Sequence, residues 1–142
     1  MEKPRVLFLC TSNSARSQMA EAILRKFAGE KFEVHSAGLE PMEINPYMLK
    51  VLQEVGIDTS GLYAKPLSKY LGNTHFSYLI TVCSKAEERC PLFPGIGKRL
   101  HWPFEDPAEF RGSEEETPQK FREIRDQIEE HIKSWLKEDD TL

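Results

Sequence analysis

A short apolar run that leads straight into a small, polar loop constrains the fold of this chain more than any other feature. Arg5 to Leu9 has the composition of a buried strand, and the next residues are Cys10-Thr11-Ser12-Asn13-Ser14-Ala15-Arg16-Ser17. A helical pattern begins directly behind them, with apolar residues at Met19, Ile23 and Phe27 before a C-cap at Gly29. Strand, tight loop and helix form a unit whose backbone N–H groups converge on an anion.

The loop holds one thiol and one guanidinium at fixed spacing, Cys10 and Arg16. An arginine binds two oxygens of a tetrahedral anion at once, and a positive environment favours the thiolate, which is the nucleophilic form of cysteine. We therefore expect Cys10 to be a thiolate nucleophile. The oxyanion would be bound by the loop residues Thr11, Ser12, Asn13, Ser14, Ala15 and Arg16. Alternatively, Cys10 is only a small buried residue at a strand end.

Composition limits the range of functions. The chain has 142 residues, the size of one domain, and we expect a single domain over residues 1–142. Its formal net charge of -4 leaves no broad positive surface for nucleic acid, so an anion has to be bound locally. The first apolar run is too short for a signal peptide or a membrane span. The three cysteines are an odd number, which favours reduced thiols over a framework of structural disulfides. These features predict a soluble, cytoplasmic monomer.

The rest of the chain alternates strand and helix patterns. Further strands are expected at residues 32–36, 76–82 and 99–102. Asn45-Pro46 predicts the start of a helix that presents Leu49, Leu52 and Val55 and ends at Gly56. Residues 57–74 are expected to form a loop with a short helical turn. Thr117-Pro118 predicts the start of a long helix whose buried stripe is Phe121, Ile124, Ile128, Ile132 and Trp135.

This order predicts an α/β fold, a three-layer sandwich with a four-stranded parallel sheet and helices on both faces. Ligands of such sheets bind outside the carboxyl ends of the strands. Cys10, Cys83 and Asp106 each follow a predicted strand at that end. The three segments are therefore expected to meet at one edge of the sheet.

Three separated motifs carry a family resemblance. They are Cys10 to Glu21, Cys83-x6-Cys90-Pro91 and the run from His101 to Pro107. In order and spacing they resemble the thioredoxin-coupled arsenate reductases, which are built on the low-molecular-weight protein tyrosine phosphatase fold. The resemblance covers nearly the whole chain. It implies an enzyme without a cofactor that acts in arsenic detoxification, with arsenate as substrate and thioredoxin as reductant.

The resemblance also implies roles for the residues of the loop. Cys10 would attack the arsenic atom, Arg16 and the loop amides would hold the oxygens, and Asp106 would protonate the departing hydroxide. Ser17 would stabilise the Cys10 thiolate through a hydrogen bond, and Asn13 would maintain the conformation of the loop.

Two further thiols would complete the reaction in the same family. Cys83 would attack Cys10 and release arsenite, and Cys90 would then attack Cys83 to leave a disulfide for thioredoxin. Reduction of arsenate takes two electrons, which two thiols supply when they form one disulfide, whereas hydrolysis of a phosphate ester takes none. A continuous helix would separate the two Cα atoms by roughly 10 Å, against about 4.4 to 6.8 Å in a disulfide. We therefore expect residues 83–97 to be mobile and to rearrange on oxidation.

The sequence also allows functions of different classes. A low-molecular-weight protein tyrosine phosphatase would use Cys10, Arg16 and Asp106 alone. Because a reductase has the same three residues, it would have a weak phosphatase side activity. A sugar-phosphotransferase subunit could carry a phosphocysteine on a similar loop, and in a thiol redox sensor Cys10 would only report oxidant.

Several of the candidate residues also have alternative roles. Asp106 also suits a helix N-cap, and Glu105 is a competing acid. The spacing of Cys83 and Cys90 does not suit a metal site, and the four histidines are expected to be structural.

Two positions depart from some members of the resembled family. Ala15 stands where some carry a further cysteine. Some also bind a monovalent cation with residues matching Asn13, Glu21, Ser36 and a later carboxylate, and here the matching later position is Lys65. The ammonium group would occupy the space of the cation, which predicts weak or absent dependence on potassium.

Overall fold

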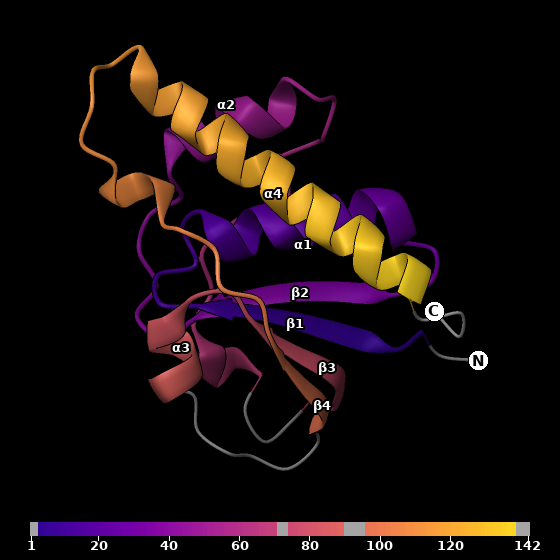
Figure 1. Ribbon diagram of the computed structural model, residues 1–142. Helices are drawn as coiled ribbons and strands as arrows, with labels where there is room; N and C mark the ends of the chain where they lie inside the picture. The colour runs from indigo at the N-terminus through magenta and orange to yellow at the C-terminus, as the bar shows by residue number, and fades with distance from the viewer. Residues whose placement is uncertain (1–2, 71–73, 90–95, 139–142) are drawn as a thin grey trace.

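Four parallel strands form the centre of the molecule in the computed structural model, which describes residues 3–70, 74–89 and 96–138 (Figure 1). They are β1 (Arg5–Cys10), β2 (Glu33–Gly38), β3 (Phe76–Thr81) and β4 (Ile96–His101). Their order across the sheet is β2-β1-β3-β4, and every pairing is parallel. The predicted four-stranded parallel sheet is therefore confirmed, and β4 begins three residues earlier than expected.

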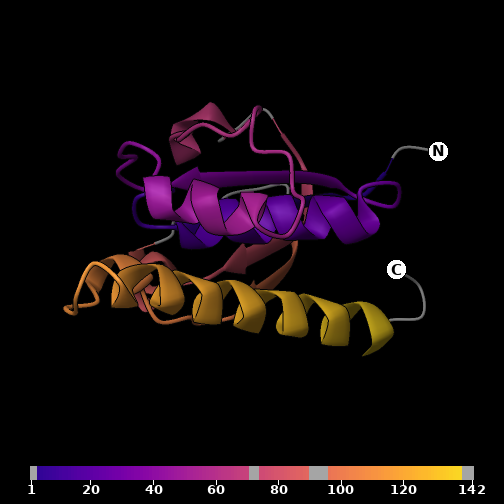
Figure 2. The ribbon, with the colours of Figure 1, turned by 90° about the horizontal axis from the view of Figure 1, so that it is seen from above.

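Helices cover both faces of the sheet. They are α1 (Arg16–Ala28), α2 (Pro46–Gln53), α3 (Ser84–Arg89) and α4 (Glu116–Glu138). Helices α1 and α4 run side by side over one face, and α2 packs against α4 (Figures 1 and 2). Helix α3 lies on the other side of the sheet, where its Glu87 contacts Thr81 of β3. Short 3-10 helices at Leu67–Lys69 and Pro107–Glu109 complete the fold, the first within the predicted turn.

The long helix α4 seals the core as predicted. Its side chains Phe121, Ile124, Ile128 and Ile132 are buried, and Trp135 stacks on Phe32. The predicted start was wrong, because Thr117 and Pro118 lie inside the first turn. Ser113 caps the start of the helix instead. Its Oγ accepts the N–H of Glu116, and the carboxylate of Glu116 accepts the N–H of Ser113. This reciprocal pair satisfies two N–H groups that a helix start leaves unpaired.

The start of α2 follows the prediction, since Asn45 Oδ1 accepts the N–H of Tyr47 at 2.9 Å. Its buried face is shifted by one residue to Met48, Val51 and Leu52, with Leu49 and Val55 only half-buried.

In α1 the C-cap at Gly29 is present, but the predicted apolar stripe stops early. Phe27 is 41% exposed, and the ammonium group of Lys133 lies 5.0 Å from the centroid of its ring. No helix in the described ranges is long and apolar enough to cross a membrane.

Candidate active site

The loop between β1 and α1 is held from outside through its carbonyl oxygens. Backbone N–H groups from residues 39–45 donate at 2.8 to 3.2 Å to the carbonyls of Cys10, Thr11, Ser12 and Ser14. Because those carbonyls point outward, the N–H groups of the same peptide units are turned toward the inside of the loop. The N–H of Asn13 donates to Cys10 Sγ at 3.1 Å. The loop thus has the inward N–H groups that an oxyanion site requires.

Asn13 maintains this conformation from a fully buried position. Its backbone φ of 53° lies in the left-handed region, which asparagine tolerates better than most residues. The side-chain Oδ1 accepts the N–H of Lys65, and Nδ2 donates to Ser17 Oγ at 2.7 Å and to Ser36 Oγ at 2.9 Å. Gly38 is needed beside it, since a Cβ there would lie 2.9 Å from the backbone nitrogen of Asn13.

Cys10 is buried at the end of β1, where its Sγ lies 2.9 Å from Ser17 Oγ. Because Ser17 Oγ accepts from Asn13, its own proton is free to point at the sulfur. Burial raises the pKa of the Cys10 thiol above its usual value, while the hydrogen bonds of Ser17 and Asn13 and the charge of Arg16 lower it. Burial thus opposes the thiolate, whereas the hydrogen bonds and Arg16 favour it, and the expectation that Cys10 reacts as a thiolate stays a prediction.

A Ser17→Ala variant tests the hydrogen bond to the nucleophile. Removing the hydroxyl takes away a contact that lowers the pKa of Cys10, so the pKa rises further and the thiolate fraction at neutral pH falls. A hydrogen bond to a charged group is worth about 1.5–3 kcal/mol, so alkylation of Cys10 by iodoacetamide at pH 7 should slow by roughly tenfold or more. Its pH profile should move to higher pH. Ser14→Ala is the control, because Ser14 Oγ bonds to Ser12 Oγ and not to the thiol; equal profiles for the two variants would contradict the assignment.

Arg16 faces the loop that follows β4. Its Nη1 donates to the carbonyl of Phe104 at 3.0 Å, and Nη2 lies 3.5 Å from Asp106 Oδ2. The other carboxylate oxygen of Asp106 accepts the N–H of Ala108 at 2.9 Å, so this residue is also the N-cap of the short helix. The competing acid Glu105 instead forms an ion pair with Lys120 and is largely exposed. The geometry therefore favours Asp106 as the acid beside the arginine.

Cys83 lies at the carboxyl end of β3, buried and free. Its Sγ is 3.4 Å from Thr11 Oγ1 of the loop. A cavity of about 370 Å³ opens between the three segments and is lined by Thr11, Ser12, Arg16, Met42, Cys83, Ser84, Lys85, Phe104, Asp106 and Glu109. The predicted meeting of the three strand ends is confirmed, with Cys10 buried next to the lining residues. Cys90, the third predicted thiol, lies outside the described residues.

A comparison of the chain with known protein families identifies it. The model of the low molecular weight phosphotyrosine protein phosphatase family matches residues 5–141. The chain belongs to this family. Within the phosphatase family, a protein named arsenate reductase from Oceanobacillus iheyensis is 42% identical over 137 residues, which are 96% of this chain and 98% of the relative.

Solved structures give the same picture of this family member. One described as an arsenate reductase in the phosphate binding state has a TM-score of 0.79 and 28% identity over 95% of this chain and 98% of its own. A thioredoxin-dependent arsenate reductase from Corynebacterium glutamicum has a TM-score of 0.66 and 35% identity, and the match covers 93% of this chain and 61% of that one.

Several residues around the loop of this phosphatase-family protein were missed by the sequence analysis. Gln18 is fully buried, and its Nε2 donates to Asn13 and to the carbonyl of Tyr63. The support from residues 38–45 was also missed, although Gly38, two residues after the predicted strand at 32–36, is a signal for close backbone contact. Lys85 and Glu109 of the cavity wall carry no sequence signal, because only the fold brings them there.

Lys65 lies beside the buried carboxylate of Glu21. Its Nζ is 3.4 Å from Glu21 Oε1 and donates to the carbonyl of Tyr63 at 2.8 Å, while the hydroxyl of Ser36 donates to the same carboxylate oxygen. Lys65 and Glu21 are each only 4% exposed. The ammonium group therefore contacts Glu21, one of the three matching residues, at the carboxylate oxygen that also accepts from a second one, Ser36.

Potassium is accordingly expected to have little effect on turnover. An ammonium group that contacts Glu21 neutralises the carboxylate and leaves no charge for a second cation to balance. Rates measured in equal concentrations of potassium and sodium chloride should agree within about twofold, since only the general screening of charge remains. A stimulation by potassium alone that is several times larger would contradict this interpretation.

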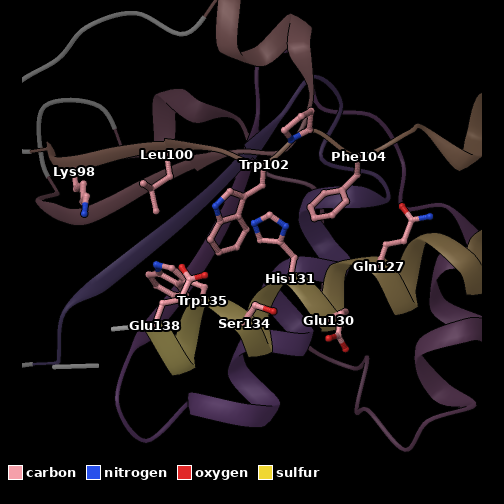
Figure 3. A pocket seen from close by; sticks show the side chains of 11 residues that line it. Lys98, Leu100, Trp102, Phe104, Gln127, Glu130, His131, Ser134, Trp135 and Glu138 are labelled. Atoms are coloured by element: carbon pink, nitrogen blue, oxygen red, sulfur yellow. The ribbon is translucent and has the colours of Figure 1, made fainter. Parts of the chain in front are cut away.

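A second and larger hollow lies elsewhere, between β4 and the last turns of α4 (Figure 3). Its volume is about 790 Å³, and aromatic side chains including Trp102, Phe104, His131 and Trp135 line it. It contains no thiol and none of the predicted site residues that the structure describes. Burial lowers the pKa of His131, which suits a neutral ring packed at 4.5 Å on Trp102. The predicted residues Arg16, Cys83 and Asp106 line the smaller cavity instead.

Proposed function

We propose that this protein reduces arsenate to arsenite through a relay of three thiols and that thioredoxin restores the reduced enzyme. The observation that carries the proposal is a second free thiol, Cys83, in the wall of the oxyanion cavity. A phosphatase has no use for a thiol at this position, whereas a two-electron reduction requires one. The arsenate reductase names of the relatives support the same reaction.

The first step forms a bond between sulfur and arsenic. The Cys10 thiolate attacks arsenate, and one oxygen leaves as water after Asp106 donates a proton. The inward N–H groups of the loop and the guanidinium of Arg16 hold the remaining oxygens. Because a guanidinium has five N–H donors, Arg16 can bind the oxyanion while it keeps its contacts with Phe104 and Asp106.

The second step moves two electrons to arsenic. The thiolate of Cys83 attacks Cys10 Sγ, the electron pair of the sulfur–arsenic bond passes to arsenic, and arsenite leaves. Cys90 then attacks Cys83 and frees Cys10. The dithiol of thioredoxin reduces the final disulfide, and thioredoxin becomes oxidised in turn. The electron balance closes, because one disulfide is formed for each arsenate that is reduced.

Formation of that disulfide needs a change in α3. The helix occupies Ser84–Arg89, between the two cysteines in the sequence. If the helix continued to Cys90, a rise of about 1.5 Å per residue would separate the two Cα atoms by roughly 10 Å, which is too long for a disulfide. Part of α3 therefore unwinds when Cys83 and Cys90 are joined.

The relay works in the cytoplasm, where thioredoxin keeps thiols reduced. We also propose that the protein is a monomer in which residues 1–142 form one domain.

A coupled assay tests the proposed function. The reduced protein is mixed with arsenate, thioredoxin, thioredoxin reductase and NADPH, and NADPH loss is followed beside hydrolysis of an aryl phosphate. We expect NADPH to be consumed in proportion to the arsenate added, with only slow phosphate release. Rapid phosphate release without any NADPH loss would instead identify a tyrosine phosphatase. Replacing thioredoxin by glutathione and glutaredoxin shows whether another thiol system supplies the electrons.

A further inference from the structure

A connected set of polar side chains ties α3 to β3 and β4 on the face of the sheet away from α4. Glu87 of α3 is at its centre and accepts the hydroxyl of Thr81 at 2.6 Å. Arg99 Nη2 lies 3.5 Å from the same carboxylate oxygen, and His101 Nδ1 lies 2.8 Å from Thr81 Oγ1. We call these four residues, Thr81, Glu87, Arg99 and His101, the Glu87 tether.

The donors and acceptors of the tether form a consistent chain. Thr81 has one hydroxyl proton, and its shortest contact is with the carboxylate of Glu87. That hydrogen bond, with the charge of Arg99, lowers the pKa of Glu87, so the group is a carboxylate at neutral pH. Thr81 Oγ1 then accepts from His101, whose Nδ1 carries a proton. The hydrogen bond from Thr81 ends on a charged acceptor, which makes it stronger than a bond between neutral groups.

Helix α3 depends on such contacts because it is short. The structure describes six residues of this helix, of which only Ala86 is buried. Isolated helices of this length are unstable in water, since too few hydrogen bonds repay the cost of nucleation. Arg99 adds a second contact by donating to the carbonyl of Glu87 at 2.8 Å. The tether therefore supplies much of what keeps α3 helical.

We propose that Glu87 is a positioning residue of the thiol relay, which holds α3 helical in the reduced protein and thereby opposes the disulfide between Cys83 and Cys90. The inference rests on the proposed function, because that disulfide is its product. The tether favours the reduced form, in which Cys83 lies against Thr11 in the cavity wall. It makes the disulfide easier for a dithiol to reduce, and it protects the resting enzyme from oxidation.

Glu87→Ala tests the proposal with Glu88→Ala as its matched control. Glu88 is the next residue of the same helix, is exposed, and loses the same charge. Both variants replace glutamate by alanine, which has the higher helix propensity. A loss of helix in Glu87→Ala alone therefore cannot come from a change in propensity. Both variants are made in a Cys10→Ser background, which keeps that thiol out of the exchange. Thr81→Val removes the other end of the short hydrogen bond and serves if Glu87→Ala fails to fold.

Two measurements are made on each variant. Hydrogen exchange of the reduced protein reports on α3 directly, and Glu87→Ala should speed exchange across residues 86–89 by roughly tenfold. Equilibration with reduced and oxidised dithiothreitol reports on the thiols, where Cys83 and Cys90 lose two protons and two electrons and oxidised dithiothreitol gains them. The variant should favour the disulfide by roughly tenfold, which is about 30 mV toward a more negative potential.

The outcomes separate the tether from the relay. Faster exchange together with the shifted equilibrium in Glu87→Ala and Thr81→Val, and neither in Glu88→Ala, supports the proposal. Unchanged exchange in Glu87→Ala overturns it, and so does faster exchange with an unchanged equilibrium, because the tether would then persist in the oxidised form. If the parent Cys10→Ser protein forms no disulfide between Cys83 and Cys90, the relay itself is wrong and the proposal fails with it. This outcome can be told apart from the others because the parent carries no mutation in α3.

Discussion

A Cys83→Ser variant is expected to lose multiple-turnover arsenate reduction by roughly 10³-fold or more while it keeps its aryl phosphatase activity. Serine preserves the size of the side chain but cannot form the disulfide that supplies two electrons to arsenic. The first step is untouched, because Cys10, Arg16 and Asp106 remain in place. NADPH loss in the thioredoxin assay and phosphate release, measured on one preparation, decide the result.

Two comparisons sharpen this test. Cys10→Ser removes the first nucleophile and should abolish both activities, whereas Ser84→Ala changes a neighbouring residue of the cavity wall and should retain both. Alkylation of Cys10 in the Cys83→Ser protein shows that the loop is still formed. Sustained arsenate reduction by Cys83→Ser would show that electrons reach arsenic by another route, and the three-thiol mechanism would be wrong.

An Arg16→Lys variant should lose about 10²- to 10³-fold in kcat/KM for arsenate. The guanidinium presents two parallel N–H groups to two oxygens, and an ammonium group presents a single point of charge on a flexible stem. Loss of one preorganised oxyanion donor in other enzymes has an effect of this size. The same variant also loses the donor to the Phe104 carbonyl, which helps to hold the loop with Asp106 near the cavity.

Arg122→Lys is the control for the change of arginine to lysine. Arg122 is on α4 and pairs with Glu54, outside the oxyanion cavity. The kcat/KM of the Arg122→Lys variant should stay within about twofold of the parent value, because a surface ion pair contributes little. A thermal unfolding curve for Arg16→Lys separates loss of binding from loss of fold. A fall in kcat/KM of less than about fivefold would remove Arg16 from its proposed role.

Strands β1 and β3 were predictable because each is a local apolar run, whereas β4 is largely polar and its first three residues were missed. The parallel order follows from the helices between the strands. The errors arose where side chains far apart in sequence compete. The apolar pattern placed Phe27 in the core, yet the ring is left at the surface beside Lys133. Thr117-Pro118 looked like a helix start, but Ser113 and Glu116 form a better one four residues earlier.

By itself the sequence determined the loop of Cys10 to Arg16, its setting between strand and helix, and the meeting of Cys83 and Asp106 at the same edge of the sheet. These features depend on local spacing and on a general rule for parallel sheets. Only the tertiary structure decided the balance of forces on Cys10, because its desolvation depends on everything packed around it. The hydrogen bonds that orient Asn13 and the tether on Glu87 were decided in the same way, since each joins segments that no sequence pattern connects.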